Sequence, residues 1–391
     1  MERDVGIKIL GGGISGLSLG YYLKKHLQTP VTVFEKESRP GGMIASQHVG
    51  DFFFEKGPRT FMTSRSPALL SLIEELGLKS ELIFAHPQKR YIYYKGKLRS
   101  LQQMLPKVAL RGLLRDWRTS PSSEDETIRS FGERRFGKWV ADFILDPVTA
   151  GVYAGSIDHL SVEKCFPKLK EIEKMHGSIV KGFKPRAKGS LFTLSGGMDM
   201  LIDALVEKCD VVTGTCVAPD YSTIPEPKYF EYVGLQVVHL AYAKDVLKKT
   251  GFGYLVPSVY GRKVMGVVFD SCVFPQQNVH KEETRLTVML RPCQDPLEEA
   301  LQAVRKDLGI DQFPLQWAIS NYEHAIPQMG LDHETRLSLL QQSAPKTIFA
   351  GNFVKGPAVN QCISLAQELA SQALSQAHRD APLYALPSHS M

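Results

Sequence analysis

The sequence predicts a fold that combines α/β and α+β architecture, and three observations indicate it. A glycine-rich turn between a strand-like and a helical segment lies at Gly11–Gly20, close to the start of the chain. A basic and then helix-rich stretch runs from Lys89 to about Pro185. Strand-like runs dominate from Tyr229 to Leu290, which indicates a second, mostly antiparallel sheet.

The first elements form a complete β-α-β unit. The apolar run Ile7–Leu10 is typical of a buried strand, Leu17–Leu27 has the apolar spacing of a helix, and Val31–Phe34 is typical of a second strand. A further helix begins at the pair Ser66 and Pro67, which suit the N-cap and the first turn. This order predicts a Rossmann-like nucleotide-binding domain.

The rest of the chain returns twice to this domain. Leu191–Leu205 and Thr347–Leu374 each predict a strand, a glycine turn and a helix, and Leu297–Leu308 predicts a helix on the second sheet. We therefore divide the chain into six segments: residues 1–88, 191–224 and 344–378 as three parts of the nucleotide-binding domain, 89–190 as an inserted helical region, 225–343 as an antiparallel-sheet domain for the substrate, and 379–391 as a disordered tail.

The composition is that of an ordinary globular protein. The chain has 391 residues, more than one compact core uses, and 43% of them are hydrophobic and 23% charged. No window of about 18 apolar residues could span a bilayer. The N-terminus lacks the basic start and the apolar stretch of a signal peptide. We expect a cytoplasmic protein, and a homodimer stays open.

Neither the cysteines nor the histidines indicate a metal site. The six cysteines contain no CxxC pair, and the eleven histidines contain no HxxxH pair. The closest histidines, His324 and His333, are nine residues apart in a predicted loop. We expect reduced thiols and no metal. No residue stands out as a catalytic base.

One stretch is strongly basic. Lys89–Arg118 holds nine Lys or Arg residues against the single acid Asp116. This predicts either a solvated basic face or contact with anions, which would be an anionic membrane surface or a carboxylate-rich substrate. Nucleic acid is disfavoured because no base-stacking motif accompanies the charge.

The opening turn has the spacing of a dinucleotide-binding turn. Gly11, Gly13 and Gly16 allow a tight turn, a close approach to a pyrophosphate and packing of helix against strand. An acid, Glu35, follows nineteen residues past Gly16, at the end of the next strand. A carboxylate there binds both ribose hydroxyls and repels a 2′-phosphate, so NADP is disfavoured.

The stretch RPGGMIAS, Arg39–Ser46, favours FAD over NAD. Its glycine pair lets a second loop approach the pyrophosphate, and it resembles the pattern of FAD proteins of the glutathione-reductase-like and amine-oxidase-like kind. Far along the chain, Gly351 and Gly356–Asn360 predict a second helix N-terminus at the middle of a long cofactor. Its amide dipole would stabilise a reduced flavin.

Nearly the whole chain resembles one family, the oxygen-dependent protoporphyrinogen/coproporphyrinogen oxidases of haem synthesis. The most particular motifs are GVYAGSIDHLSVEKCFPKL (Gly151–Leu169) and GFGYLVPS (Gly251–Ser258). The others are GGGISGL (Gly11–Leu17), FEKGPRTF (Phe54–Phe61), ELGL (Glu75–Leu78), KRYIYYKGKLRSL (Lys89–Leu101), ETIRSFGERRFG (Glu126–Gly137), SGGMDML (Ser195–Leu201), LTVML (Leu286–Leu290), AIPQ (Ala325–Gln328) and GPAVNQCI (Gly356–Ile363).

The resemblance implies an activity: FAD-dependent six-electron oxidation of a porphyrinogen to the porphyrin, with O2 regenerating the flavin and peroxide released. Protoporphyrinogen IX is the first choice of substrate and coproporphyrinogen III the second. The implied FAD-lining residues are Gly11, Gly13, Ile14, Ser15, Gly16, Glu35, Lys36, Gly42, Met43, Gly57, Pro58, Arg59, Thr60, Val217, Ala358, Val359 and Asn360.

The resemblance also implies a substrate pocket. Arg90 would meet a propionate, and Phe252, Gly253, Leu255 and Met289 would sandwich the macrocycle. From the residues alone, the alternative for Arg90 is one more member of the basic stretch, while ordinary core packing explains Phe252 and Leu255 equally well. The family's membrane attachment would suit the basic amphipathic segment Leu105–Trp117, which would place the protein on the inner face of the cell membrane.

One departure from the family concerns the adenosine end of the cofactor. After CDVVTGTCVAPD the family has extra strands that this chain lacks, so Val217 and Asp220 are almost adjacent and FAD affinity could be reduced. Two alternatives stay open. One is an FAD-dependent amine oxidase on the same scaffold, which a slot at Phe252 and Met289 too small for a tetrapyrrole would favour. The other, motivated by the missing strands, is a degenerate protein that binds flavin or porphyrin without turnover.

Overall fold

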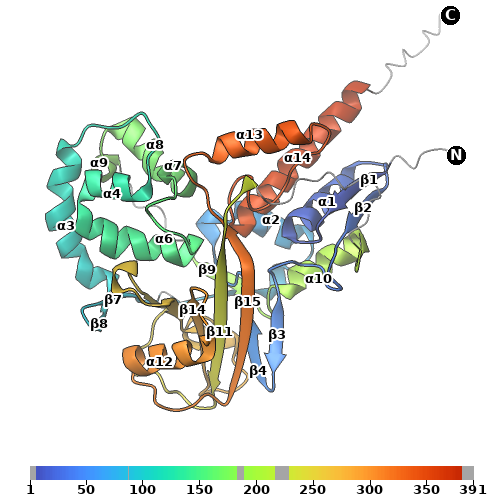
Figure 1. The fold of residues 1–391 in the computed structure, drawn as a ribbon. Coiled ribbons are helices and arrows are strands. Elements are labelled where there is room, and N and C mark those ends of the chain that lie inside the picture. The colour runs from blue at the N-terminus through green and yellow to red at the C-terminus, as the bar shows by residue number, and fades with distance from the viewer. Residues whose placement is uncertain (1–5, 87, 183–188, 216–228, 381–391) are drawn as a thin grey trace, which may run out of the picture.

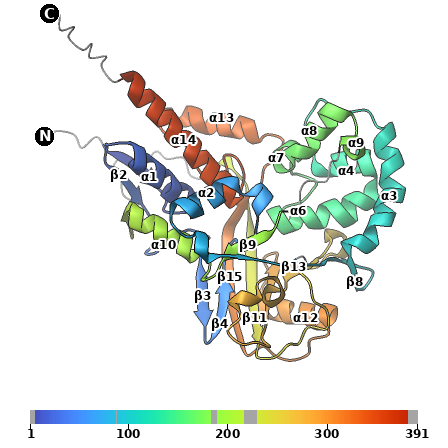
Figure 2. The ribbon, with the colours of Figure 1, turned by 180° about the vertical axis from the view of Figure 1, so that it is seen from behind.

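The computed structural model describes residues 6–86, 88–182, 189–215 and 229–380. Figure 1 shows a nucleotide-binding lobe near the two termini, a large sheet in the middle and a helical lobe on the far side. Figure 2 shows the same three parts from behind. Within these residues, no helix is both long and apolar enough to cross a membrane.

The nucleotide-binding lobe is built on a parallel sheet in the order β1-β2-β10. Its elements are β1 (Ile7–Leu10), α1 (Ile14–His26), β2 (Val31–Phe34), α10 (Asp199–Lys208) and β10 (Asp210–Val212). The predicted β-α-β unit is thus present, with the helix starting directly at the glycine turn. Among the described strands β1 pairs only with β2, so its other edge has no strand partner.

Two smaller sheets join this lobe to the rest of the molecule. The hairpin pairs β3 (Ser46–Val49) with β4 (Phe52–Glu55), and an antiparallel sheet has the order β5-β9-β6. The remaining elements here are β5 (Phe61–Met62), η1 (Thr63–Arg65), α2 (Pro67–Glu75), η2 (Lys79–Glu81), β6 (Leu82–Phe84) and β9 (Leu191–Leu194).

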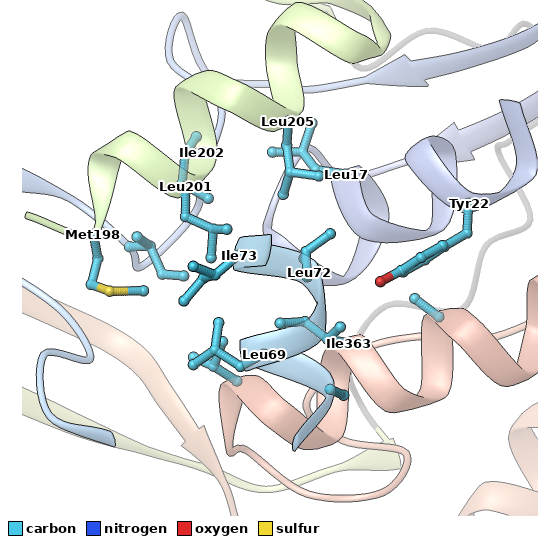
Figure 3. Close-up of a cluster of buried hydrophobic side chains, with 14 of the residues drawn as sticks. Leu17, Tyr22, Leu69, Leu72, Ile73, Met198, Leu201, Ile202, Leu205 and Ile363 are labelled. Atoms are coloured by element: carbon cyan, nitrogen blue, oxygen red, sulfur yellow. The ribbon is translucent and has the colours of Figure 1, made fainter. Parts of the chain in front are cut away.

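Helices from distant parts of the sequence share the core of the nucleotide-binding lobe. Figure 3 shows Leu17 of α1, Leu72 of α2, Leu205 of α10 and Ile363 of α14 (Val359–Asp380) pointing toward one another. All four side chains are fully buried. Burying such a side chain contributes about 1.5–3 kcal/mol. This cluster therefore fixes the C-terminal helix against the opening glycine turn.

The large sheet has seven strands in the order β15-β11-β14-β13-β12-β7-β8. All neighbours are antiparallel except β12 and β7, which run parallel. Its elements are β7 (Arg90–Tyr94), β8 (Lys97–Ser100), β11 (Tyr232–Tyr242), β12 (Gly253–Leu255), η5 (Ser258–Tyr260), β13 (Val264–Val268), α11 (Asp270–Val273), η6 (Pro275–Gln277), β14 (Thr284–Leu290), α12 (Pro296–Leu308) and β15 (Gln316–Pro327).

The helical lobe follows β8 directly. It comprises α3 (Leu101–Arg118), α4 (Ile128–Phe136), α5 (Lys138–Val140), the π-helix η3 (Ala141–Leu145), α6 (Asp146–Tyr153), α7 (Val162–Cys165), α8 (Pro167–His176) and α9 (Ile179–Gly182). A buried ion network holds it together: Arg135 of α4 pairs with Asp116 of α3 and Glu173 of α8, and all three are 0% exposed. Removing one partner would leave a buried charge and cost about 3–5 kcal/mol.

Four sequence expectations are corrected. Thr347–Ala350 forms no strand, and α13 (His333–Ser343) precedes it. His324 and His333 lie in β15 and at the start of α13 rather than in a loop. Residues 90–100, at the start of the region predicted as helical, form strands of the large sheet because β7 pairs with β12. The helix α14 extends to Asp380, and the rest of the predicted tail lies outside the described residues.

Candidate cofactor and substrate site

The glycine turn combines a tight backbone with open space. Gly11 has φ of +98°, and a Cβ on Gly16 would lie 1.9 Å from the carbonyl oxygen of Gly11, so both positions require glycine. A Cβ on Gly13 would instead meet nothing within 4 Å. Gly13 is also the N-cap of α1 and has no side-chain cap. Ile14 and Ser15 begin α1, so the N–H groups of its first turn lie beside this open position. Such a helix N-terminus suits a pyrophosphate.

Glu35 lies against this turn at the end of β2. Its side chain is buried and accepts hydrogen bonds from the backbone N–H groups of Gly12, at 2.7 Å, and Glu37, at 3.0 Å. This fixes the carboxylate beside the place where the first ribose of a dinucleotide would lie. The next residue, Lys36, is exposed and pairs with Glu37 at 3.7 Å, so its side chain points to solvent.

The second glycine loop reaches the first, as the RPGGMIAS stretch predicts. The N–H of Gly41 donates to the carbonyl oxygen of Gly12 at 2.7 Å, and a Cβ on Gly42 would lie 3.4 Å from Cα of Gly13. The loop then continues to Met43, whose carbonyl oxygen would lie 1.9 Å from a Cβ on Gly57. Backbone contacts thus lead from the glycine turn to the segment Gly57–Thr60, where Pro58 and Thr60 are half-buried.

Arg59, in this segment, lies at the boundary with the large sheet. Its Nη1 donates to Oδ1 of Asp270 at 3.1 Å and also contacts Oγ1 of Thr287. Oγ1 of Thr287 in turn donates to Oδ2 of Asp270 at 2.7 Å, and Nδ1 of His239 lies 3.0 Å from the same hydroxyl. The four side chains form one hydrogen-bonded chain that spans the two lobes, and we call it the Arg59 chain.

A narrow cleft opens beside the Arg59 chain. Its lining residues come from β4 and the following loop on one side and from the large sheet with its short helices on the other: Phe53, Phe54, Glu55, Arg59, Asp270, Phe274, Gln277, Arg285 and Thr287. Glu55 is buried, and this burial raises the pKa of its carboxyl to about 7. Glu55 also accepts the N–H of Met198 at 2.7 Å and so holds the start of α10.

The predicted substrate residues gather next to the cleft. The guanidinium of Arg90 lies 5.1 Å from the ring centre of Phe252, and Gly253 pairs with Arg90 in the parallel register of β12 and β7. Phe252 and Met289 join one apolar cluster with Phe274, which also lines the cleft. Leu255 faces the helical lobe instead, since a Cβ on Gly151 of α6 would lie 2.7 Å from it.

Two cations lie together at this place. Surrounding protein and the neighbouring charge of Arg65 lower the pKa of Arg90, although water still reaches both side chains. The charge of Arg65 also lowers the pKa of Tyr153 of α6, against the larger effect of burial, which raises it. Within the described part of the chain, neither arginine forms an ion pair with a carboxylate. The pair therefore offers positive charge to an anionic group from outside the chain.

The C-terminal part of the predicted cofactor site lies against α2. Gly356 has φ of +130°, and α14 begins at Val359, which is buried, after the exposed Ala358. Oδ1 of Asn360 accepts the N–H of Leu69 at 3.1 Å and so caps α2. The amide carbonyl of Asn360 is therefore engaged within the chain. Val217 lies outside the described residues.

Four residues of the site are not among those predicted from the sequence: Asp270, Thr287, His239 and Glu55. One signal could have found Thr287: it precedes Met289 by two residues on β14, and alternate residues of a strand share a face. Nothing local singles out Asp270 or His239, because their partners are distant in sequence.

The sequence is similar to that of known flavoproteins. A family model described as "Flavin containing amine oxidoreductase" matches residues 14–218. Protoporphyrinogen oxidase of Bos taurus is 31% identical over 94% of this chain and 98% of its own length. That alignment spans 473 positions, more than the 391 residues of this chain, so this chain lacks segments that its relative has.

Solved structures share the fold. A "putative protoporphyrinogen oxidase" from Exiguobacterium sp. 255-15 superposes with a TM-score of 0.81 at 19% identity, covering 95% of this chain and 98% of that one. Cyclohexylamine oxidase from Brevibacterium oxydans IH-35A reaches a TM-score of 0.70 at 14% identity, covering 96% and 100%.

Proposed function

Because the chain belongs to the family of flavin-containing amine oxidoreductases, we propose that it is an FAD-dependent oxidase that converts a porphyrinogen to the porphyrin in haem biosynthesis. Protoporphyrinogen IX is the proposed substrate. Supporting this choice, relatives with that activity in their names match nearly the full chain, from Bos taurus and Homo sapiens to Schizosaccharomyces pombe.

The single structural observation that carries the proposal is an apolar surface beside two arginines that form no ion pair with a carboxylate of the described residues. A porphyrinogen is a large apolar ring with carboxylates on one side. The cluster of Phe252 and Met289 offers the apolar surface, while Arg90 and Arg65 offer positive charge at its edge. An amine substrate would itself be cationic and would be repelled by these two arginines.

The residues of the glycine turn fit FAD. The open space at Gly13, against which Gly42 lies, would hold the pyrophosphate, and the Glu35 carboxylate would accept the ribose hydroxyls. When bound, FAD supplies the hydride acceptor and passes the electrons to O2. The chain itself binds and orients the ring: Arg90 would hold a propionate by charge-assisted hydrogen bonds, and the apolar cluster would exclude water from the reacting carbon.

The test uses purified protein loaded with FAD. Added protoporphyrinogen IX should give a porphyrin fluorescence rise well above autoxidation, with O2 uptake and peroxide release. A protein that holds FAD without this rise would contradict the proposal. Peroxide formed from amines would then support the amine oxidase alternative, and bound porphyrin without turnover would support the degenerate binding protein. Parallel turnover of coproporphyrinogen III decides between the two porphyrinogens.

We also propose that the helical lobe attaches to an anionic membrane surface. Trp117 and Leu114 of α3 are 65% and 58% exposed, and Met175 of α8 is 63% exposed. The amino group of Lys181 lies 5.5 Å from the ring centre of Trp117. Exposed apolar side chains beside basic ones favour the interface of anionic lipid. The exchange Trp117→Ser should reduce co-sedimentation with phosphatidylserine vesicles, and equal sedimentation would contradict it.

A further inference from the structure

The Arg59 chain has a direction that its hydrogen atoms define. The hydroxyl of Thr287 donates its one hydrogen to Asp270, at 2.7 Å, so it can only accept from its other two neighbours. One of these is the guanidinium of Arg59. The other is Nδ1 of His239, which must then carry the ring hydrogen. Every bonding position of this hydroxyl is filled, which holds all three partners in place.

His239 is kept neutral in this arrangement. It is 0% exposed, and burial together with the charges of Arg59, Lys56 and Arg285 lowers its pKa well below the ordinary value. Phe54 stacks on its ring at 5.1 Å between centres. Its Nε2 has no hydrogen-bond partner among the described residues. His239 thus contributes to the Arg59 chain through one hydrogen bond, which its Nδ1–H donates to Thr287.

The position of Arg59 follows from the backbone path described above. The glycine turn contacts Gly42, Met43 contacts Gly57, and Arg59 comes two residues later, at the large sheet. A cofactor that extends from Glu35 across Gly13 and continues along this path reaches Arg59 with its far end. Among the described residues, the Arg59 guanidinium hydrogen-bonds to Asp270 and Thr287, and the Arg59 and Asp270 side chains are 13% and 15% exposed. The buried Glu55 also senses the charge of Arg59 and lines the same cleft.

We propose that Asp270 and Thr287 are positioning residues for Arg59: together they direct its guanidinium toward the flavin, and the Asp270 carboxylate offsets the positive charge that the flavin senses there. The inference rests on the proposed use of FAD and does not depend on which substrate is oxidised. A two-electron-reduced flavin is anionic, so an unbalanced guanidinium close by favours reduction. Asp270 therefore keeps the flavin easier to reoxidise by O2.

The test measures the midpoint potential of bound FAD by dye-coupled reduction, with no porphyrinogen present. We expect Asp270→Asn, which keeps an acceptor for Arg59 and removes the charge, to favour reduction about tenfold, which is about 30 mV upward for a two-electron couple. In an Arg59→Gln background the same exchange should shift the potential clearly less, because no guanidinium is left for Asp270 to position and only the direct field of the carboxylate is lost. An equal shift in both backgrounds, or no shift in either, would overturn the proposal.

A matched control lies on α12, the helix that packs against the same sheet. Asp307 is a buried carboxylate that pairs with Arg262 at 2.9 Å and accepts the hydroxyl of Tyr254 at 2.8 Å, away from the cleft. Asp307→Asn should lower the thermal midpoint and leave the potential unchanged. If both exchanges moved the potential alike, the effect would be one of overall charge, and the proposal would fail.

A second pair of variants covers the case in which Asp270→Asn does not fold. Thr287→Val removes the hydroxyl at constant shape, and Thr287→Ser keeps it. We expect the valine variant to lower kcat about tenfold with little change in KM and to alter the flavin absorption spectrum, with both effects reversed in the serine variant. Valine and serine variants that behave alike would contradict a positioning role. A yellow protein with the expected potential shifts and no porphyrinogen turnover would instead contradict the proposed function alone.

Discussion

The two halves of the candidate site are built by different means. On the nucleotide side the backbone determines the geometry of the site, since Gly16 and Gly57 have no room for a Cβ and Gly11 has a positive φ. On the substrate side, contacts between side chains that are distant in sequence determine the geometry. Arg59 hydrogen-bonds to Asp270 and Thr287, which lie 211 and 228 positions further along the chain. Short sequence motifs are therefore enough to predict the first half, whereas the second half forms only once the chain has folded.

The largest expected effect separates two glycines of the same turn. Gly16→Ala would place its Cβ 1.9 Å from the carbonyl oxygen of Gly11, and we expect it to lower the free energy of unfolding by about 3 kcal/mol. Gly13→Ala meets open space and an ordinary φ of −75°, so the apoprotein should change by about 1 kcal/mol or less. The added methyl group should nonetheless reduce FAD affinity at least tenfold, because it would occupy the space proposed for the pyrophosphate. This loss corresponds roughly to the energy of one hydrogen bond to a charged group.

Thermal unfolding of the apoproteins and titration with FAD measure the two effects separately. If Gly13→Ala bound FAD as tightly as the unmodified chain, the pyrophosphate would not lie at the open space of the turn. If both alanine variants lost equal stability, the contrast between a steric and a binding glycine would be wrong.

The next effect tests the substrate side. Arg90→Ala should raise KM for the porphyrinogen ten- to hundredfold with little change in kcat, because a charge-assisted hydrogen bond to a carboxylate contributes about 1.5–3 kcal/mol. Arg90→Lys keeps the charge and loses the planar fork, so its KM should lie between the two. Arg118→Ala, which removes one charge from the same basic stretch, serves as the control. An unchanged KM in Arg90→Ala would remove this residue from the site.

How much the sequence predicts follows from this difference. The β-α-β unit, Glu35 and the two glycine loops were predicted because each depends on neighbours within one turn or one strand pair. The strand at Thr347–Ala350 was predicted wrongly: its apolar pattern suits a strand, but the segment does not pair with any described strand. The pairing of β7 with β12 joins residues about 160 positions apart, and periodicity carries no information on such a choice.

The smallest expected effect lies where the two halves meet, at Glu55. This carboxyl lines the cleft and holds Met198 at the start of α10, and its burial raises its pKa to about 7, above the ordinary value near 4.5. Because the folded state binds this proton more tightly than the unfolded state, the stabilising contribution is full below pH 4.5. It is lost as the pH rises through about 7.

From pH 6 to pH 8 the loss from Glu55 amounts to about 1 kcal/mol. Glu55→Gln keeps an acceptor for the N–H of Met198 and cannot ionise. Its free energy of unfolding in urea should therefore fall less between these two pH values than that of the unmodified chain, by that amount. Equal slopes in both proteins would show that Glu55 ionises in the folded state as it does in water. A carboxylate and its solvation would then be accommodated in the cleft between the halves, which would make the cleft wetter than the packing of Phe53 and Phe54 implies.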